Sequence, residues 1–329
     1  MEDFVLQTPV AFLIFNRPER TRRVFQEIAR ARPRRLLIVA DGPRFPEEEE
    51  RCAAARSVLD QINWDCEVLT NLSDKNLGCR KRVSSGLDWV FEQCEEAIIL
   101  EDDCLPHLSF FRYCAELLER YRDDERIMAI SGDNFQFGQR RTPFSYYFSR
   151  FLHIWGWASW RRAWQHYDVE MRHWPALRET GWLADVLGDA RAVEYFRAIF
   201  DKTHAGQIDT WDYQWSFACW SQSGMAALPE VNLISNIGWG DDATHTKAES
   251  LTANLPTEEL QFPLRHPPCV IKNREADQFT FEKVFADWTN RGLPQRLRQR
   301  LARLVSGLQD KPAATQTPER STLAENQTK

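Results

Sequence analysis

Three consecutive acids, Glu101–Asp103, follow directly after the apolar run Ala97–Leu100. Carboxylates this close together raise one another's pKa unless a cation neutralises them. A divalent metal ion supplies that charge, and such ions bind one or two carboxylates together with substrate phosphates. The alternative is a solvated acidic turn, but Cys104–Pro106, which comes next, is not a polar loop. We therefore expect a metal site at these acids.

The neighbouring residue types suggest what that metal would serve. We expect Asp103 to bind it directly, whereas Asp102 points to the opposite side of the strand and suits ribose hydroxyls or metal-bound water. Arg17 would be a surface arginine if taken alone, but it follows another apolar run and can bind phosphate through two N–H groups. Asp41 could accept hydrogen bonds from a nucleobase N–H and from ribose. Together these residues predict a site for a nucleoside diphosphate sugar.

Apolar runs alternate with helical patterns along the first 135 residues. We predict strands at 10–15, 36–40, 66–69, 97–100 and 127–131, and helices at 21–31, 47–59, 81–91 and 110–121. This alternation predicts an α/β fold with a mostly parallel sheet and helices on both faces. Ligands of such sheets bind beyond the carboxyl ends of the strands. The candidate donor-binding residues at that rim are Asn16, Arg17, Asp41, Gly42, Lys81, Glu101 and Asp102, with Asp103 as the metal ligand.

Several classes of protein are excluded by what the sequence lacks. No GxGxxG follows the first strand, which argues against a dinucleotide oxidoreductase, and no GxxxxGK[ST] indicates a P-loop. The net charge of -6 is unlike that of a nucleic-acid-binding protein. None of the eight cysteines forms a CxxC pair, and no apolar run has the length of a signal peptide or a membrane span. We expect a cytoplasmic protein with reduced cysteines.

The second half of the chain is rich in aromatic residues. Trp157, Trp160 and Trp164 are spaced i, i+3, i+7, which predicts one face of a helix. These tryptophans would form a packed core stripe, and Trp155–Trp157, at the start of that helix, are a candidate sugar platform. The aromatic half would therefore bind the acceptor.

One acid of this half is placed to act as a general base. Asp212 lies between Trp211 and Tyr213, and a partly desolvated carboxylate can take a proton from an acceptor hydroxyl. The alternative role of Asp212 is a helix N-cap. Asp209 is the neighbouring acid that could replace it.

Four regions follow from these patterns. They are a nucleotide-sugar-binding half (1–135), an acceptor-binding and catalytic half (136–285), a basic amphipathic helix (286–310) and a disordered tail (311–329). The leucines and arginines of 291–305 could lie on the inner face of an anionic membrane, or dock on the domain or a partner. His245 follows a glycine-rich turn, and it is either a further metal or phosphate ligand or a surface histidine.

Four segments carry a family resemblance: "FLIFNRPERTRRVFQEIARARPRRLLIVADGPR", "NLGCRKRVSSGLDWVF", "AIILEDDCLPHLSFFRYCAELLERYRDD" and "ISGDN". They resemble the nucleotide-binding half of the Rossmann-like GT-A glycosyltransferases. The most similar pattern is the N-acetylglucosaminyltransferase I type with its bacterial relatives. "TWDYQWSFACWSQSGMAALPEVNLISNIGWG" is similar to the second half of that family in order and spacing. The resemblance spans residues 9 to about 246.

The resemblance implies transfer with inversion from a UDP-sugar, UDP-GlcNAc among the candidates, with Mn²⁺ or Mg²⁺. On the matched positions, Asp103 would bind the metal, Glu101 and Asp102 the nucleoside, Arg17 the diphosphate and Asp41 the uracil. The family has two adjacent acids after the Trp, where this chain has Asp212 and Tyr213. Either Asp212 serves as the base after a small shift, or another acid does.

Two other functions compete with a glycosyltransferase. A sugar nucleotidylyltransferase would need a glycine-rich, basic loop after the first strand, where this chain has Phe15–Pro18. A carbohydrate-binding protein that has lost catalysis would not need the intact Glu101–Asp103. The expected acceptor is a hydroxyl of a glycan, a lipid-linked sugar or a protein, with peripheral membrane contact through 291–305.

Overall fold

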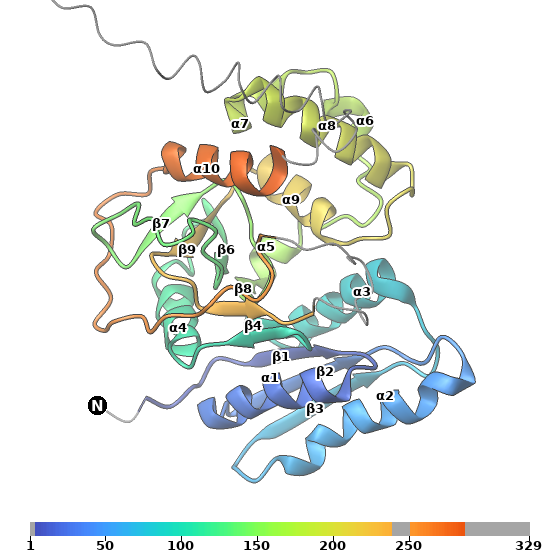
Figure 1. The fold of residues 1–329 in the computed structure, drawn as a ribbon. Coiled ribbons are helices and arrows are strands. Elements are labelled where there is room, and N and C mark those ends of the chain that lie inside the picture. Colours follow the sequence, from blue (N-terminus) through green and yellow to red (C-terminus); the bar gives the residue numbers. More distant parts are fainter. Residues whose placement is uncertain (1–3, 239–250, 287–329) are drawn as a thin grey trace, which may run out of the picture. The chain divides into compact units, whose positions relative to one another are not determined.

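A large sheet organises residues 4–238 and 251–286, the part of the chain that the computed structural model describes (Figure 1). Its strand order is β3-β2-β1-β4-β8-β6-β9-β7. The strands are β1 (Val10–Ile14), β2 (Arg35–Ala40), β3 (Glu67–Leu72), β4 (Glu96–Glu101), β6 (Ile127–Ser131), β7 (Tyr146–Ser149), β8 (Trp157–Trp160) and β9 (Met225–Pro229). A small second sheet pairs β5 (Cys104–Pro106) with β10 (Ile234–Asn236).

Helices follow most of these strands. They are α1 (Pro18–Ala31), α2 (Glu49–Arg56), α3 (Gly78–Gln93), α4 (Ser109–Arg120), α5 (Arg161–Trp164), α6 (Trp174–Leu177), α7 (Trp182–Leu187), α8 (Ala190–His204), α9 (Asp212–Ser221) and α10 (Arg274–Thr280). Short 3₁₀ turns flank α2 at Pro46–Glu48 and Ser57–Gln61, and a π-helical turn, Phe281–Phe285, follows α10.

The alternation along β1 shows how the sheet separates two cores. Val10, Phe12 and Ile14 pack in one core with α1 and α4, whereas Ala11 and Leu13 pack in the other with α3 and α9. Successive side chains of a strand point to opposite faces, so a strand buried on both sides needs apolar residues throughout. The predicted α/β fold with helices on both faces of a mostly parallel sheet is confirmed.

The ends of α1 are fixed by its own residues. Pro18 occupies the first turn, where its missing N–H costs no hydrogen bond. Arg32 ends the helix in the left-handed conformation, with its N–H donating to the Ile28 carbonyl at 3.0 Å. The turn from β1 into α1 therefore holds Arg17, the residue before Pro18, at the carboxyl end of β1.

Strand direction changes across the sheet. β3, β2, β1 and β4 are all parallel, whereas β8 lies antiparallel between β4 and β6. β6 and β9 are parallel, and β7 is antiparallel to β9 at the far edge. Strands from both sides of residue 135 thus belong to the same sheet.

The tryptophan stripe is not on a helix, and the prediction of one was wrong. Trp157 and Trp160 begin and end β8, and Trp164 ends the short helix α5. Residues three apart on a strand point to opposite faces, so Trp157 and Trp160 pack in different cores. All three side chains are buried, as expected for core residues.

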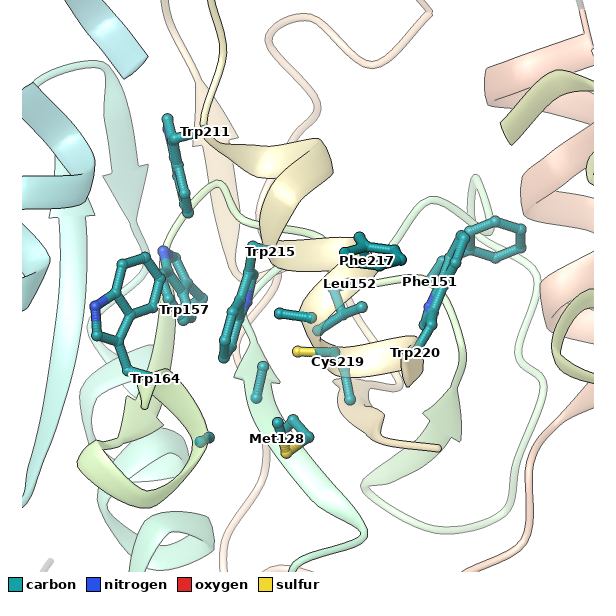
Figure 2. Packing of buried hydrophobic residues seen from close by; sticks show 14 of the residues in the cluster. Met128, Phe151, Leu152, Trp157, Trp164, Trp211, Trp215, Phe217, Cys219 and Trp220 are labelled. Carbon is teal, nitrogen blue, oxygen red and sulfur yellow. The ribbon is translucent and has the colours of Figure 1, made fainter. Parts of the chain in front are cut away.

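Trp157 lies at the centre of an aromatic cluster (Figure 2). Its ring stacks on Trp211 with a centroid separation of 5.8 Å and lies 5.6 Å from Trp215. Trp164 stacks on Tyr167 at 4.2 Å on the other side. Aromatic pairs of this kind add to the free energy gained from burial. The cluster fixes α9, whose first turn borders the pocket described below.

The remaining predictions for the chain concern its cysteines, tail and membrane contact. All eight cysteines are free thiols, and most are buried. Within 4–238 and 251–286, no helix is both long and apolar enough to cross a membrane. His245, the basic segment 291–305 and the tail 311–329 lie outside the described residues.

Candidate active site

A cavity of about 490 Å³ opens at the carboxyl ends of β1, β2 and β4. The N-terminal turns of α3 and α9 border it from the other side. The residues that line it are Leu13–Phe15, Arg17, Val39, Asp41, Arg44, Asn76, Gly78, Cys79, Arg82, Val83, Glu101–Asp103, Ile154, Trp155, Asp209–Asp212, Asn236 and Gly238. Of the residues predicted at the rim of the sheet, Arg17, Asp41 and Glu101–Asp103 thus lie together at this cavity.

Arg17 neutralises part of the acidic triplet. Its Nη1 donates to Asp103 Oδ2 at 2.6 Å and to Asp102 Oδ1 at 3.0 Å. The other oxygen of Asp102 accepts a hydrogen bond from the Phe15 N–H at 3.0 Å. Charge-assisted hydrogen bonds of this kind are stronger than neutral ones. The two acids therefore have fixed positions at the floor of the cavity.

One guanidinium does not balance three carboxylates. Burial, together with the charges of Asp103 and Asp102, raises the pKa of Glu101 well above its ordinary value. Burial also raises the pKa of Asp102, although Arg17 opposes that shift. Burial lowers the pKa of Arg17, but the three carboxylates outweigh it and raise the pKa overall. Among the described residues, Arg17 is the guanidinium that pairs with these acids, and burial and mutual repulsion outweigh its effect on the pKa of Glu101 and Asp102.

The donor set fits a cation that is shared with a ligand better than a metal cage built by the protein. Among the described residues, no three His, Cys, Asp or Glu side chains converge on a common metal position. A divalent ion held by one carboxylate, waters and two phosphates needs no such cage. Such an ion would also neutralise carboxylate charge of Glu101–Asp103 that Arg17 does not balance. Asp103 is the acid of the triplet whose carboxylate lines the cavity beside Gly238.

The second sheet positions Asp103 from outside. Asn236 of β10 pairs with Cys104, and the Ile237 N–H donates to the Asp103 carbonyl at 2.8 Å. Gly238 then passes so close that a Cβ atom there would overlap the Asp103 carboxylate. A larger residue at 238 would force the Asp103 carboxylate to shift, because the backbone lies directly against the acid.

Asp41 ties two loops together. Its Oδ1 accepts hydrogen bonds from the N–H groups of Gly42 and Leu77, each at 2.9 Å. Its Oδ2 accepts from Asn76 Nδ2 at 3.0 Å and from the Gly78 N–H at 3.2 Å. A carboxylate offers about four acceptor positions. Those of Asp41 are all engaged by the protein itself.

Three residues expected at the donor site lie elsewhere. Asn16 is buried and donates to Glu48 Oε1 at 2.7 Å, so its amide supports a carboxylate that in turn binds Arg44. Gly42 packs under the backbone of Lys75 and does not line the cavity. Lys81 is exposed on α3 and does not line it either. These three expectations are corrected, because neither the turn nor the helix phase was visible in the sequence.

Two arginines at the cavity were missed. Arg82, the residue after Lys81, is buried and lines the cavity, with its Nη2 donating to the Asn71 carbonyl at 2.7 Å. Arg44 lines it from the loop after β2, where its guanidinium lies 5.4 Å from the centre of the Phe15 ring. Arg44 follows the predicted strand-end residues Asp41 and Gly42, which is the signal that could have found it, whereas Arg82 lies within a predicted helix.

The two candidate bases have different surroundings. Asp212 begins α9, and its Oδ1 accepts hydrogen bonds from the Thr210 hydroxyl and, at 2.9 Å, from the Tyr213 N–H. The N-cap position of α9 is Trp211, so the N-cap alternative for Asp212 is wrong. Asp209, in the loop between α8 and α9, contacts the first turn of α3, where it accepts a long hydrogen bond from the Arg80 N–H at 3.4 Å. Both acids line the cavity.

Cys79 lines the cavity near three of its acidic residues, Glu101, Asp209 and Asp212. Burial, followed by the charges of Glu101, Asp212 and Asp209, raises the pKa of this thiol far above its ordinary value. The thiol therefore stays protonated and is a poor nucleophile. Its neighbours show that the acids of β4 and of the α9 turn face the same space. Of the candidate sugar platform, Trp155 lines the cavity and packs edge-on against Phe135 at 5.4 Å, whereas Trp157 is fully buried, so the expectation for Trp157 is corrected.

Comparison with known proteins gives little beyond this geometry. No protein-family model matches the chain, and no curated protein sequence matches it significantly. Similar solved structures include 4-diphosphocytidyl-2C-methyl-D-erythritol synthase from Anaerococcus prevotii (9% identity, 68% of this chain and 88% of that one, TM-score 0.34). Two others are apo mouse xyloside xylosyltransferase 1 (12%, 66% and 84%, 0.31) and UDP-glucose pyrophosphorylase with UDP-glucose (9%, 39% and 64%, 0.23). At these TM-scores the similarity carries no argument, and the resemblance to the N-acetylglucosaminyltransferase I type stays a prediction.

Proposed function

We propose that the chain is an inverting glycosyltransferase that transfers a sugar from a UDP-sugar to a hydroxyl of a glycan, a lipid-linked sugar or a protein. One observation carries the proposal. A single cavity brings the Arg17–Asp102–Asp103 cluster of the strand ends together with Asp212 of α9. A diphosphate leaving group needs the first set of charges, and an attacking hydroxyl needs the second.

The donor would lie along the rim of the parallel strands. Arg17 would bind the diphosphate, since a guanidinium matches phosphate oxygens in a bidentate way. Asp103 would be the protein ligand of a Mn²⁺ or Mg²⁺ ion, and Asp102 and Glu101 would contact the nucleoside. When bound, such an ion stabilises the negative charge that develops on the leaving diphosphate. UDP-GlcNAc is one candidate donor.

The acceptor would enter the cavity from the wall formed by the aromatic second half of the chain, residues 136–285. Asp212 would take the proton of the acceptor hydroxyl. At the same time the hydroxyl oxygen would bond to the anomeric carbon, and the bond from that carbon to the diphosphate would break. A single displacement of this kind inverts the anomeric configuration. Trp155 and Trp211 line the cavity beside Asp212, where they would exclude water and pack against sugar rings.

Calorimetric titration of the full chain tests the donor site. We expect one nucleoside diphosphate among UDP, GDP, CDP and dTDP to bind, with an affinity that rises when Mn²⁺ is present. At 100 times its dissociation constant such a ligand adds about 2.7 kcal/mol to the free energy of unfolding, so a thermal-shift assay should also detect it. Absence of binding with every nucleotide and metal would refute the proposal.

A further inference from the structure

The amide of Asn76 has only one chemically reasonable orientation. Its Nδ2 lies 3.0 Å from Asp41 Oδ2 and 2.9 Å from the Gly42 carbonyl oxygen. Both neighbours are acceptors, so the NH₂ group must face them, and an exchange of the amide nitrogen and oxygen would set acceptor against acceptor. Both hydrogens of Asn76 are thus used inside the protein.

The carbonyl of Asn76 is what remains for a ligand. Among the described residues, no donor is within hydrogen-bond distance of Asn76 Oδ1, and the residue is half-buried at the cavity wall. Val39 of β2 and Val83 of α3 line the same cavity as Asn76, which lies in the loop between β3 and α3. Apolar side chains next to a single acceptor suit a flat heterocycle with one ring N–H better than a ribose, whose hydroxyls need several polar partners.

We propose that Asn76 Oδ1 accepts the ring N–H of the donor's uracil, and that Asp41 is a positioning residue that acts through Asn76. This inference rests on the proposed function and sharpens it. The direct contact between Asp41 and uracil that the family resemblance implies would require an acceptor position, but all four are taken by Gly42, Asn76, Leu77 and Gly78. The acidic charge of Asp41 serves to fix a neutral acceptor.

A uracil methylated at N3 separates the two arrangements. We would titrate the full-length protein with UDP and with N3-methyl-UDP in the presence of Mg²⁺. The methyl group removes the ring N–H, so the wild type should bind the analogue roughly tenfold or more weakly, because a polar group is left without its partner. In Asn76→Ala the acceptor is gone, so UDP should bind more weakly and the two ligands should bind within about twofold of each other.

A second variant tests the positioning role of Asp41. Asp41→Asn replaces one acceptor oxygen with an NH₂ group that faces two donors, either Gly42 and Leu77 or Asn76 and Gly78, so the contacts that hold the Asn76 loop are disturbed. UDP should bind roughly tenfold more weakly, but the same substitution should cost little more in an Asn76→Ala background. Additive losses would mean that Asp41 contacts the base itself. Asn63→Ala, at an exposed asparagine away from the cavity, is the matched control, and it should leave both affinities unchanged.

The outcomes separate this inference from the proposed function. If UDP binds but the N3-methyl analogue binds equally well to the wild type, Asn76 does not read the ring N–H. The inference also fails if Asn76→Ala keeps the full discrimination, or if a nucleotide other than UDP is the one that binds; the donor site stands in each case. If no nucleoside diphosphate binds at all, the donor site itself is wrong, and the role of Asn76 is wrong with it.

Discussion

The two lateral halves of the sheet have different roles. We call β3, β2, β1 and β4 the charged side, and β8, β6, β9 and β7 the aromatic side. β3, β2, β1 and β4 are parallel, and β1, β2 and β4 deliver charged residues to the cavity at their carboxyl ends. On the other side, β8, β6, β9 and β7 change direction repeatedly and pack against aromatic side chains (Figure 2). Because the parallel strands end at the same edge of the sheet, their charged residues lie close together. Dense packing of aromatic side chains fixes the opposite wall of the cavity. Substitutions on the two sides should therefore differ in what they damage.

The strongest test of this contrast is Asp103→Ala on the charged side. It removes the proposed metal ligand and one carboxylate partner of Arg17, so sugar transfer should fall by about 10³-fold or more, given several kcal/mol of transition-state stabilisation. The thermal midpoint should not fall, because one of three repelling acids is gone. Initial rates with Mn²⁺ and thermal unfolding measure both. Unchanged metal-dependent activity would show that Asp103 does not bind the metal.

The complementary test is Trp215→Ala on the aromatic side. Trp215 is fully buried and contacts Trp157 and Trp164, with ring centroids 5.6 and 5.1 Å away. Its truncation leaves a large cavity, so the free energy of unfolding should fall by about 3–5 kcal/mol. Denaturant unfolding measures the loss. Trp215→Phe should recover part of the lost free energy of unfolding. A loss below about 1 kcal/mol in Trp215→Ala would mean that the aromatic cluster does not fix the cavity wall at α9.

A third substitution acts where the two sides meet. Asp212→Asn keeps the shape of the residue but removes the proposed base, so turnover should fall by about 10²–10³-fold while UDP affinity changes little. Comparison of kcat with the dissociation constant of UDP measures this. Asp209→Asn is the matched variant at the neighbouring acid. A larger loss in Asp209→Asn than in Asp212→Asn would transfer the role of base to Asp209.

The smallest expected effect is a pH dependence of stability on the aromatic side. Burial raises the pKa of Asp277 to about 6, although hydrogen bonds from the Ser149 hydroxyl and the Arg150 N–H oppose the shift. An ordinary Asp has a pKa of about 4. The native state therefore binds the proton more tightly, and this contribution to stability is present below about pH 4 and is lost as the pH rises to about 6.

Asp277→Asn removes that titration. Its stability should change less than that of the wild type between about pH 4 and pH 6. Urea unfolding at a series of pH values measures the difference. Asp201→Asn, a partly exposed acid whose pKa is lowered by Arg178, is a control that should not flatten the same interval. Parallel curves for wild type and Asp277→Asn would refute the assignment.

The sequence predicted the charged side well because its signals are local. Continuous apolar runs such as Val10–Ile14 are bounded by turn residues, and a parallel sheet brings the residues that follow them together. Arg17, Asp41 and Glu101–Asp103 were located in this way. Arg82 was missed in favour of Lys81 because the phase of a helix depends on which face packs, which one sequence does not reveal.

The aromatic side was harder because its signals are ambiguous. The spacing of Trp157, Trp160 and Trp164 matches a helix, yet tertiary pairing makes the first two part of β8. Tyr146–Ser149 and Met225–Pro229 are short strands without alternation, and they went unrecognised. A sequence also does not reveal which acceptor positions of an Asp are already occupied, since three of the four donors to Asp41 come from residues 76–78.

The position of β8 has a consequence for how the chain is made. β4 ends at Glu101, but the strand that covers its second edge begins only at Trp157. On a ribosome that adds roughly 5–20 residues per second, the apolar edge of β4 waits several seconds for its partner. Exposed apolar strand edges invite pairing with other chains. The nascent chain therefore passes through an interval in which one edge of β4 is open to pairing with other chains.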